Sequence, residues 1–235
     1  NQLHVVAPSE WMAKEARASS LLSGAPVRVI PHGLDETTFH PRPIEGLRAP
    51  LGIPKEHSIV LFVAQSVQNH NKGFDLLADA LSSLRSESVT LLSIGGTAPD
   101  LNTKLSHRHL GTIESNLLLS IFYSLANLFV IPSRQEAFGQ TALESMACGT
   151  PVVGFDTGGI PDMVRPGETG WLAEVGNVRA LREAIEQALS DDARRERIGQ
   201  RCREVVEEEY TLEVQARRYR DLYAELAQES ADDSR

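Results

Sequence analysis

The chain has 235 residues, a length that fits one large domain or one domain with part of a second. With 41% hydrophobic and 23% charged residues it has the composition of a globular protein, which excludes a disordered or fibrous chain. Its 23 basic and 32 acidic residues give a net charge of −9, which argues against a nucleic-acid binder. Two cysteines, Cys148 and Cys202, favour a reducing compartment. No apolar run approaches the ~20 residues of a membrane helix.

Short apolar runs alternate with amphipathic stretches along the chain. The expected strands are 4–7, 27–30, 58–64, 89–94, 128–131 and 152–155, with weaker ones near His109 and Trp171. The expected helices are 10–22, 74–84, 117–125, 141–147 and 178–189. Such alternation predicts βαβ units and a parallel sheet, and strands apolar on both faces predict helices on both sides. The fold class is therefore α/β with a doubly wound sheet.

Composition shifts suggest where the chain divides. The segment 41–46 has two prolines and a glycine and predicts a linker. Charged residues become dense after residue 180, which predicts exposed helical surface that includes the acidic run 206–209. The last residues, 228–235, lack apolar periodicity and are expected to form a frayed tail.

The densest group of candidate functional residues occupies 132–151, directly after an expected strand. The loop is therefore expected at the carboxyl end of a parallel strand, where ligands bind in open α/β sheets. Gly139 allows a tight turn. The amides of Gln140 and Thr141 are expected to be free at the start of the next helix, where the helix dipole favours a phosphate.

Two glutamates flank this turn. Glu136 precedes it and Glu144 follows in the helix, so a loop and a helix can bring both to one cleft. Carboxylates accept charge-assisted hydrogen bonds from sugar hydroxyls. On spacing alone, an N-capping glutamate followed by a solvated one explains the pattern equally well.

Weaker candidates lie in other loops. Lys72 and Gly73 stand where a loop meets a helix, a place for an anion, although a lone surface lysine usually has no function. The glycines of 156–162 and 95–97 also follow strands, where turn chemistry alone explains them. His107 and His109 lack a third ligand, so no metal site is predicted. Cys148 is expected to be a small buried hydrophobe.

Taken together, these residues resemble one family. The segment 132–153, with seven residues between Glu136 and Glu144, is similar to the glutamate-x7-glutamate motif of retaining GT-B glycosyltransferases. It is most similar to the family-four group, also called glycosyl transferases group one. The similarity continues through 158–162 and 167–172 and upstream through 72–73 and 29–41, so it covers nearly the whole chain.

The resemblance implies a Rossmann-like doubly wound parallel sheet that forms the C-terminal half of a GT-B fold. Residues 1–42 resemble the end of the N-terminal acceptor domain and the hinge, 43–208 the nucleotide-sugar-binding domain, and 209–235 the C-terminal crossover helix and tail. Because the chain opens within what looks like a strand, most of the acceptor domain is expected to be missing from it. The chain alone is therefore expected to transfer no sugar.

The resemblance also implies residue roles. Lys72 would neutralise the donor diphosphate and Glu136 would contact the donor sugar, which makes these two the expected catalytic residues. Glu144 would bind the ribose hydroxyls. The other implied donor-binding residues are Leu110, Gly111, Phe138, Gly139, Gln140 and Thr141. Members often have Gly-Arg-Leu where this chain has 64–66, so the usual phosphate-binding arginine is absent, and Arg134 is a candidate replacement.

The implied function is transfer of a hexose from a GDP- or UDP-type sugar, without a metal or other cofactor, to a glycan, lipid or small molecule. A cytoplasmic enzyme of envelope or exopolysaccharide synthesis is expected, with peripheral membrane association through the acceptor domain. Glu114 gives guanine a slight preference over uracil. The alternatives are a nucleotide-sugar 2-epimerase or a sucrose- or trehalose-phosphate synthase on the same fold. A non-catalytic nucleotide-sugar sensor or partner subunit is the alternative from another class.

Overall fold

The computed structural model describes residues 3–99, 101 and 105–232. Its strands are β1 Val5–Ala7, β2 Val27–Val29, β3 Ser58–Val63, β4 Val89–Ile94, β5 Ser106–His109, β6 Leu128–Ile131, β7 Val152–Phe155 and β8 Gly170–Ala173. Its helices are α1 Glu10–Ala18, η1 His70–Lys72, α2 Phe74–Ser82, α3 Asn116–Leu125, α4 Gln140–Ala147, α5 Ile160–Met163, α6 Val178–Leu189, α7 Asp192–Glu209 and α8 Leu212–Asp232. Every strand predicted from the sequence is present within one residue of the expected limits, and the two weaker strands are β5 and β8.

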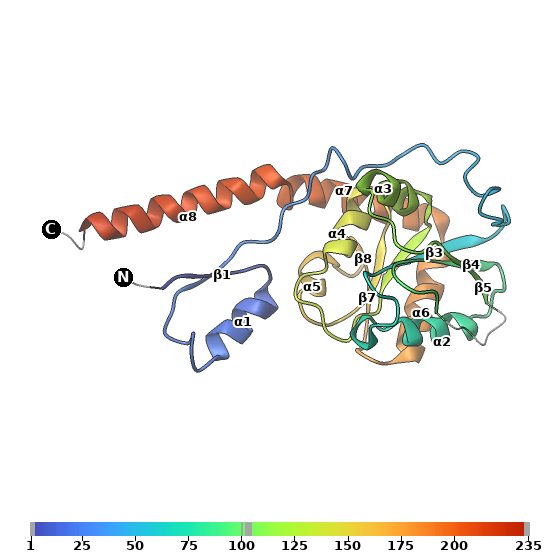
Figure 1. Cartoon of the computed structure of the whole chain (residues 1–235), viewed down its shortest axis with the longest axis horizontal. Helices are drawn as coiled ribbons and strands as arrows, with labels where there is room; N and C mark the ends of the chain where they lie inside the picture. The colour runs from blue at the N-terminus through green and yellow to red at the C-terminus, as the bar shows by residue number, and fades with distance from the viewer. Residues whose placement is uncertain (1–2, 100, 102–104, 233–235) are drawn as a thin grey trace.

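Six strands form one parallel sheet in the order β5-β4-β3-β6-β7-β8. The strand order reverses between β3 and β6, where Val60 pairs with Leu128. The side chains of β4, β6 and β7 are buried on both faces, because helices cover both sides of the sheet (Figure 1). The predicted α/β doubly wound parallel sheet is therefore confirmed, and the general rule for such sheets places the expected ligand crevice at the carboxyl ends of β3 and β6.

The covering helices have recognisable start signals. The side chains of Ser115, Asn177 and Asp191 accept hydrogen bonds from backbone N–H groups in the first turns of α3, α6 and α7. By contrast, α2 and α4 begin at glycines and have no side-chain cap. These two helices follow β3 and β6, the strands that border the crevice.

The first βαβ unit lies apart from the large sheet. Here β1 pairs in parallel with β2 alone, and α1 packs on both. Figure 1 shows α8 as a long rod that extends from the large unit over this small one. Arg28 on β2 forms an ion pair with Glu225 on α8. A bridge between Leu34 and Thr211 joins the segment after β2 to the start of α8.

Two sequence-based expectations about helix ends were wrong in detail. The first helix ends at Ala18 rather than residue 22. Ser19 begins a turn there, and its carbonyl accepts a hydrogen bond from the amide of Ser23. Residues 228–232 continue α8 instead of fraying, since alanine, glutamate and glutamine favour a helix without an apolar face; 233–235 lie outside the described residues. None of the described helices is long and apolar enough to span a membrane.

The acidic run 206–209 is also not simply solvated surface. Val206 is fully buried. Glu209 accepts a two-point fork from Arg165, with oxygen to nitrogen distances of 2.9 and 2.6 Å, and this fork lowers the pKa of Glu209. The pair ties the end of α7 to the segment after α5, a contact between residues 44 positions apart that sequence periodicity does not reveal.

Candidate functional site

The loop after β6 leads into α4 at the carboxyl edge of the sheet. Gly139, the residue before α4, has φ 102°, a left-handed conformation that favours glycine. Within the described residues, no acceptor contacts the backbone N–H groups of Gln140 and Thr141. The positive end of the α4 dipole and these free donors lie together at the position where the sequence predicts anion binding, and the binding itself stays a prediction.

Lys72 reaches the same place from the loop after β3. Its ammonium Nζ lies 2.6 Å from Glu136 Oε2, and the side chains are 35% and 16% exposed. Ser133 Oγ, 3.4 Å away, donates to the same carboxylate oxygen. The structure thus brings the two predicted catalytic residues together as a partly exposed ion pair.

Glycines let three loops meet at this pair. Gly73 has φ 67°, and a Cβ placed on it would lie 1.9 Å from Pro132 O. Gly158 has φ 56°, and its Cβ would lie 1.8 Å from Glu136 O, while the amide of Gly159 donates to that oxygen at 2.9 Å. The glycines therefore permit close backbone approach as well as turns: Gly73 lies against Pro132, and Gly158 and Gly159 lie against the carbonyl of Glu136.

Phe138 faces away from the anion position. Its ring is buried and meets His32 edge-on, with ring centres 5.1 Å apart, and it lies 6.4 Å from the ring of Tyr210. The neighbouring carbonyl of Ala137 accepts from Ser9 Oγ at 2.7 Å. The Phe138 side chain therefore packs against the segment after β2 and the end of α7, and the donor contact of its backbone stays a prediction.

Glu144 projects from α4 toward α3. Tyr123, fully buried, donates its hydroxyl to Glu144 Oε2 at 2.8 Å. Burial raises the pKa of Glu144 to about 7, and the hydrogen bond from Tyr123 opposes that rise. No hydrogen bond or ion pair joins Glu144 to Glu136 in the described part of the chain, so a shared cleft for the two carboxylates remains a prediction.

A pH dependence of stability follows from Glu144. Its folded pKa of about 7 exceeds the ordinary value of 4.5, so its contribution is fully present below pH 4.5 and is lost as pH rises through 7. As the pH rises from 5 to 8, the wild type should lose stability that Glu144→Gln keeps. The unfolding free energy of the variant minus that of the wild type is therefore expected to increase by about 2 kcal/mol over this range. Urea unfolding across this range measures the difference, and a difference that does not change with pH would contradict the assignment.

Leu110 and Gly111, the predicted base-pocket segment, follow the edge strand β5. The amide of Leu110 donates to Ser93 O at 2.9 Å, and the amide of Gly95 donates to Gly111 O at 2.8 Å. Gly111 has φ 69° and open space around its α-carbon. This segment shares the carboxyl edge with the loop after β4.

His107 and His109 form a hydrogen-bonded cluster, each with a ring nitrogen within 2.9 Å of Ser93 Oγ. Burial, with the charges of His109 and Arg108, lowers the pKa of His107. Among the residues that the structure describes, no three His, Cys, Asp or Glu side chains are placed to hold a metal ion. The histidines therefore act as hydrogen-bonding groups between β4 and β5, and Cys148 is buried as expected.

Arg134, the candidate replacement for the missing phosphate-binding arginine, is already paired. Its guanidinium forks onto Asp75 with distances of 3.0 and 2.6 Å and also donates to His70 O. The fork lowers the pKa of Asp75 and raises that of Arg134. Lys72 is consequently the cation that faces Glu136 and the anion position.

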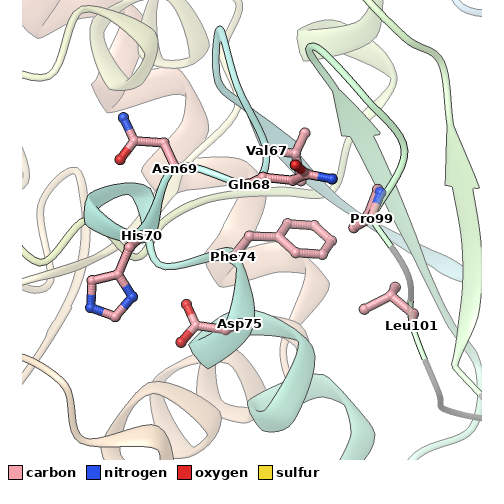
Figure 2. Close-up of a pocket in the computed structure, with 8 residues that line it drawn as sticks. All are labelled: Val67, Gln68, Asn69, His70, Phe74, Asp75, Pro99 and Leu101. Carbon is pink, nitrogen blue, oxygen red and sulfur yellow. The ribbon is translucent and has the colours of Figure 1, made fainter.

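A pocket of 380 Å³ lies beside η1 and the first turn of α2. Figure 2 shows the Phe74 ring pointing toward the side of the pocket where Pro99 and Leu101 lie, with His70 on the opposite side. None of the predicted donor-binding residues lines it. Sequence reasoning did not single out three residues that hold the site together: Tyr123, Ser9 and Asp75. Their partners lie 21, 128 and 59 positions away along the chain.

The sequence model of the family described as Glycosyl transferases group 1 matches residues 43–205, more than half of the chain. The chain therefore belongs to this family, as the motifs around Glu136 and Glu144 predict. The match begins within the predicted linker. The domain limits 1–42, 43–208 and 209–235 remain predictions.

Curated relatives agree with this membership. The chain is 26% identical over 207 residues to N-acetyl-alpha-D-glucosaminyl L-malate synthase from Bacillus anthracis, covering 85% of this chain and 54% of that protein. It is 34% identical over 197 residues to D-inositol 3-phosphate glycosyltransferase 1 from Catenulispora acidiphila, covering 74% of this chain and 46% of that protein. The chain spans about half the length of these relatives.

Solved structures share the fold. Sucrose-phosphate synthase from Thermosynechococcus elongatus matches with a TM-score of 0.82 and 30% identity, covering 95% of this chain and 58% of that one. Anabaena HepE, solved in complex with UDP and glucose, matches with a TM-score of 0.80 and 21% identity, covering 94% and 63%. The predicted fold, the C-terminal half of the GT-B arrangement, is confirmed by these structures.

Proposed function

We propose that this chain is the donor-binding part of a retaining glycosyltransferase. It binds a nucleotide-diphosphate sugar, and the whole protein transfers the hexose to a glycan, lipid or small molecule in envelope or exopolysaccharide synthesis. The observation that carries the proposal is the Lys72–Glu136 ion pair beside the uncapped start of α4. It offers a cation and free amides for phosphate next to a carboxylate for sugar hydroxyls.

The chain's own groups account for leaving-group stabilisation in this proposal. As the bond between the sugar and the diphosphate breaks, negative charge grows on the departing phosphate, and Lys72 and the amides of Gln140 and Thr141 stabilise it. Binding is proposed to need no metal. Calorimetric titration with UDP and with GDP, each with and without EDTA and added magnesium, tests this point, and binding that appears only with magnesium would contradict it.

Experiments can decide which nucleotide base the donor carries and which class of acceptor receives the sugar. Glu114 is exposed and, as an acceptor for guanine N–H groups, favours GDP slightly, whereas HepE was solved with UDP, so UDP and GDP are titrated side by side. At least tenfold tighter binding of one nucleotide decides the base.

The names of two relatives point to small acceptors, malate and inositol 3-phosphate. Another relative, from Salmonella typhimurium, is named for lipopolysaccharide. Transfer assays with each acceptor class separate an enzyme from a sensor.

A prediction on Glu136 tests the site directly. Because Glu136 pairs with Lys72, its carboxylate competes with phosphate for the ammonium. Glu136→Gln is therefore expected to bind bare UDP about threefold tighter. The sugar's own contribution is measured as the affinity for UDP-glucose divided by the affinity for bare UDP. In Glu136→Gln this ratio should fall about tenfold, because a charge-assisted hydrogen bond to the sugar is lost.

Both ligands are titrated into wild type, Glu136→Gln and Glu87→Gln. Glu87→Gln changes an exposed carboxylate just before β4, at the opposite end of the strands from the ion pair, and is expected to bind UDP and UDP-glucose like the wild type. If Glu136→Gln weakens both ligands equally, the carboxylate does not distinguish sugar from phosphate, and its assigned role is wrong.

A further inference from the structure

Arg134 connects the two loops that carry the ion-pair partners. Its backbone amide donates to Asn71 O at 2.8 Å, next to Lys72, and its own position is two residues before Glu136. Its carbonyl accepts from Thr157 Oγ1 at 3.3 Å. The backbone of Arg134 thus touches the loops after β3 and β7 from the loop after β6.

The side chain of Arg134 holds the same turn from a second direction. Its two terminal nitrogens bind the two oxygens of Asp75, in the first turn of α2, and one of them also donates to His70 O. A planar fork of this kind fixes orientation as well as distance. The side chain of Arg134 is 23% exposed and that of Asp75 is 57% exposed, so water reaches the pair and screens it in part.

The turn that carries Lys72 has few other anchors. η1 is a single 3-10 turn, and its own bonds are local: Lys72 N–H donates to Asn69 O, Gly73 N–H to His70 O, and Asn71 N–H to Asn69 Oδ1. In the described part of the chain, every hydrogen bond between the backbone of 69–72 and another loop involves Arg134. Short 3-10 turns are weak by themselves.

We propose that Arg134 is a positioning residue whose fork with Asp75 sets the place of Lys72 against Glu136. It acts on the donor diphosphate through Lys72 and does not bind the phosphates itself. The inference rests on the proposed function for its effect on nucleotide binding, whereas its effect on the ion pair is independent of any ligand.

The ligand-free test measures the reactivity of the Lys72 amine. Brief acylation with acetic anhydride followed by mass spectrometry compares Lys72 with the exposed lysines Lys14 and Lys55. Glu136→Gln provides the reference value for an unpaired Lys72. Arg134→Gln and Asp75→Asn are each expected to raise Lys72 acylation about threefold, as loss of a partly exposed ion pair does.

Arg165→Gln is the matched control for these variants. It breaks a fork of the same geometry, onto Glu209, away from the Lys72 turn, and it is expected to leave Lys72 acylation unchanged. Thermal melting of all variants shows that each is folded at the labelling temperature. If Lys72 acylation stays at the wild-type value in both Arg134→Gln and Asp75→Asn, the proposal is overturned, whatever happens to nucleotide binding.

A titration with UDP distinguishes positioning from direct contact. As a positioning pair, Arg134→Gln and Asp75→Asn both weaken UDP binding about tenfold, and neither weakens it further in a Lys72→Met background. As a direct phosphate ligand, Arg134 would be freed by Asp75→Asn, and UDP would bind more tightly; that result overturns the proposal. If the wild type binds neither UDP nor GDP, the proposed function fails, and the acylation result still decides the role of Arg134.

Discussion

Replacing Gly158 by alanine is expected to destabilise the protein by about 3 kcal/mol or more and to abolish measurable binding of UDP-glucose. The residue has φ 56°, and an added Cβ would lie 1.8 Å from the carbonyl oxygen and 2.8 Å from the carbonyl carbon of Glu136. Both contacts are with backbone, so no side chain can rotate away. The loop after β7 must retreat, and Glu136 loses the amide of Gly159 that holds its carbonyl.

Gly167→Ala separates the two parts of this effect. Gly167 has φ 81°, but a Cβ on it would meet nothing within 4 Å. It is expected to cost about 1 kcal/mol, the cost of a left-handed conformation alone, and to leave binding intact. Urea unfolding and calorimetry on both variants make the comparison. Equal losses of stability would mean that backbone strain, and not the clash with Glu136, governs Gly158.

Much of the fold follows from local patterns in the sequence. The runs 59–63 in β3 and 128–131 in β6 are apolar at successive positions, as expected for strands covered on both faces. Glycine before a helix, as at Gly73 and Gly139, marks the uncapped helices beside the crevice. The order of strand and loop then predicts that Lys72 and Glu136 approach one another, because both follow strands that end at the same edge.

Other parts of the site depend on pairs that no local pattern contains. Tyr123 is an aromatic residue on an apolar helix, and its hydroxyl contact with Glu144 exists only because α3 packs on α4. Arg134 is a candidate replacement for the missing phosphate-binding arginine on sequence alone, yet its guanidinium forms an ion pair with Asp75, 59 residues earlier. A charge pattern gives the number of cations, and only the packing shows which of them remain available to a ligand.

Lys72→Met is expected to weaken UDP binding about thirtyfold or more. The substitution removes a charge-assisted contact, and such contacts contribute about 1.5–3 kcal/mol. It also leaves the carboxylate of Glu136, only 16% exposed, without its partner and close to the incoming phosphates. Repulsion from that carboxylate adds to the loss.

The double variant Lys72→Met with Glu136→Gln removes both charges and is therefore expected to bind UDP more tightly than Lys72→Met alone. Lys55→Met is the charge-matched control: it changes an exposed lysine in the loop before β3 and should bind like the wild type.

Raising the salt concentration from 50 to 500 mM should weaken UDP binding to the wild type more than to Lys72→Met, because Lys72 meets the phosphates where water and ions reach it. If the wild type and Lys72→Met lose the same fraction of affinity with salt, Lys72 does not face the phosphates. The phosphate position would then depend on the amides of Gln140 and Thr141, whose fixed dipoles no lysine substitution removes.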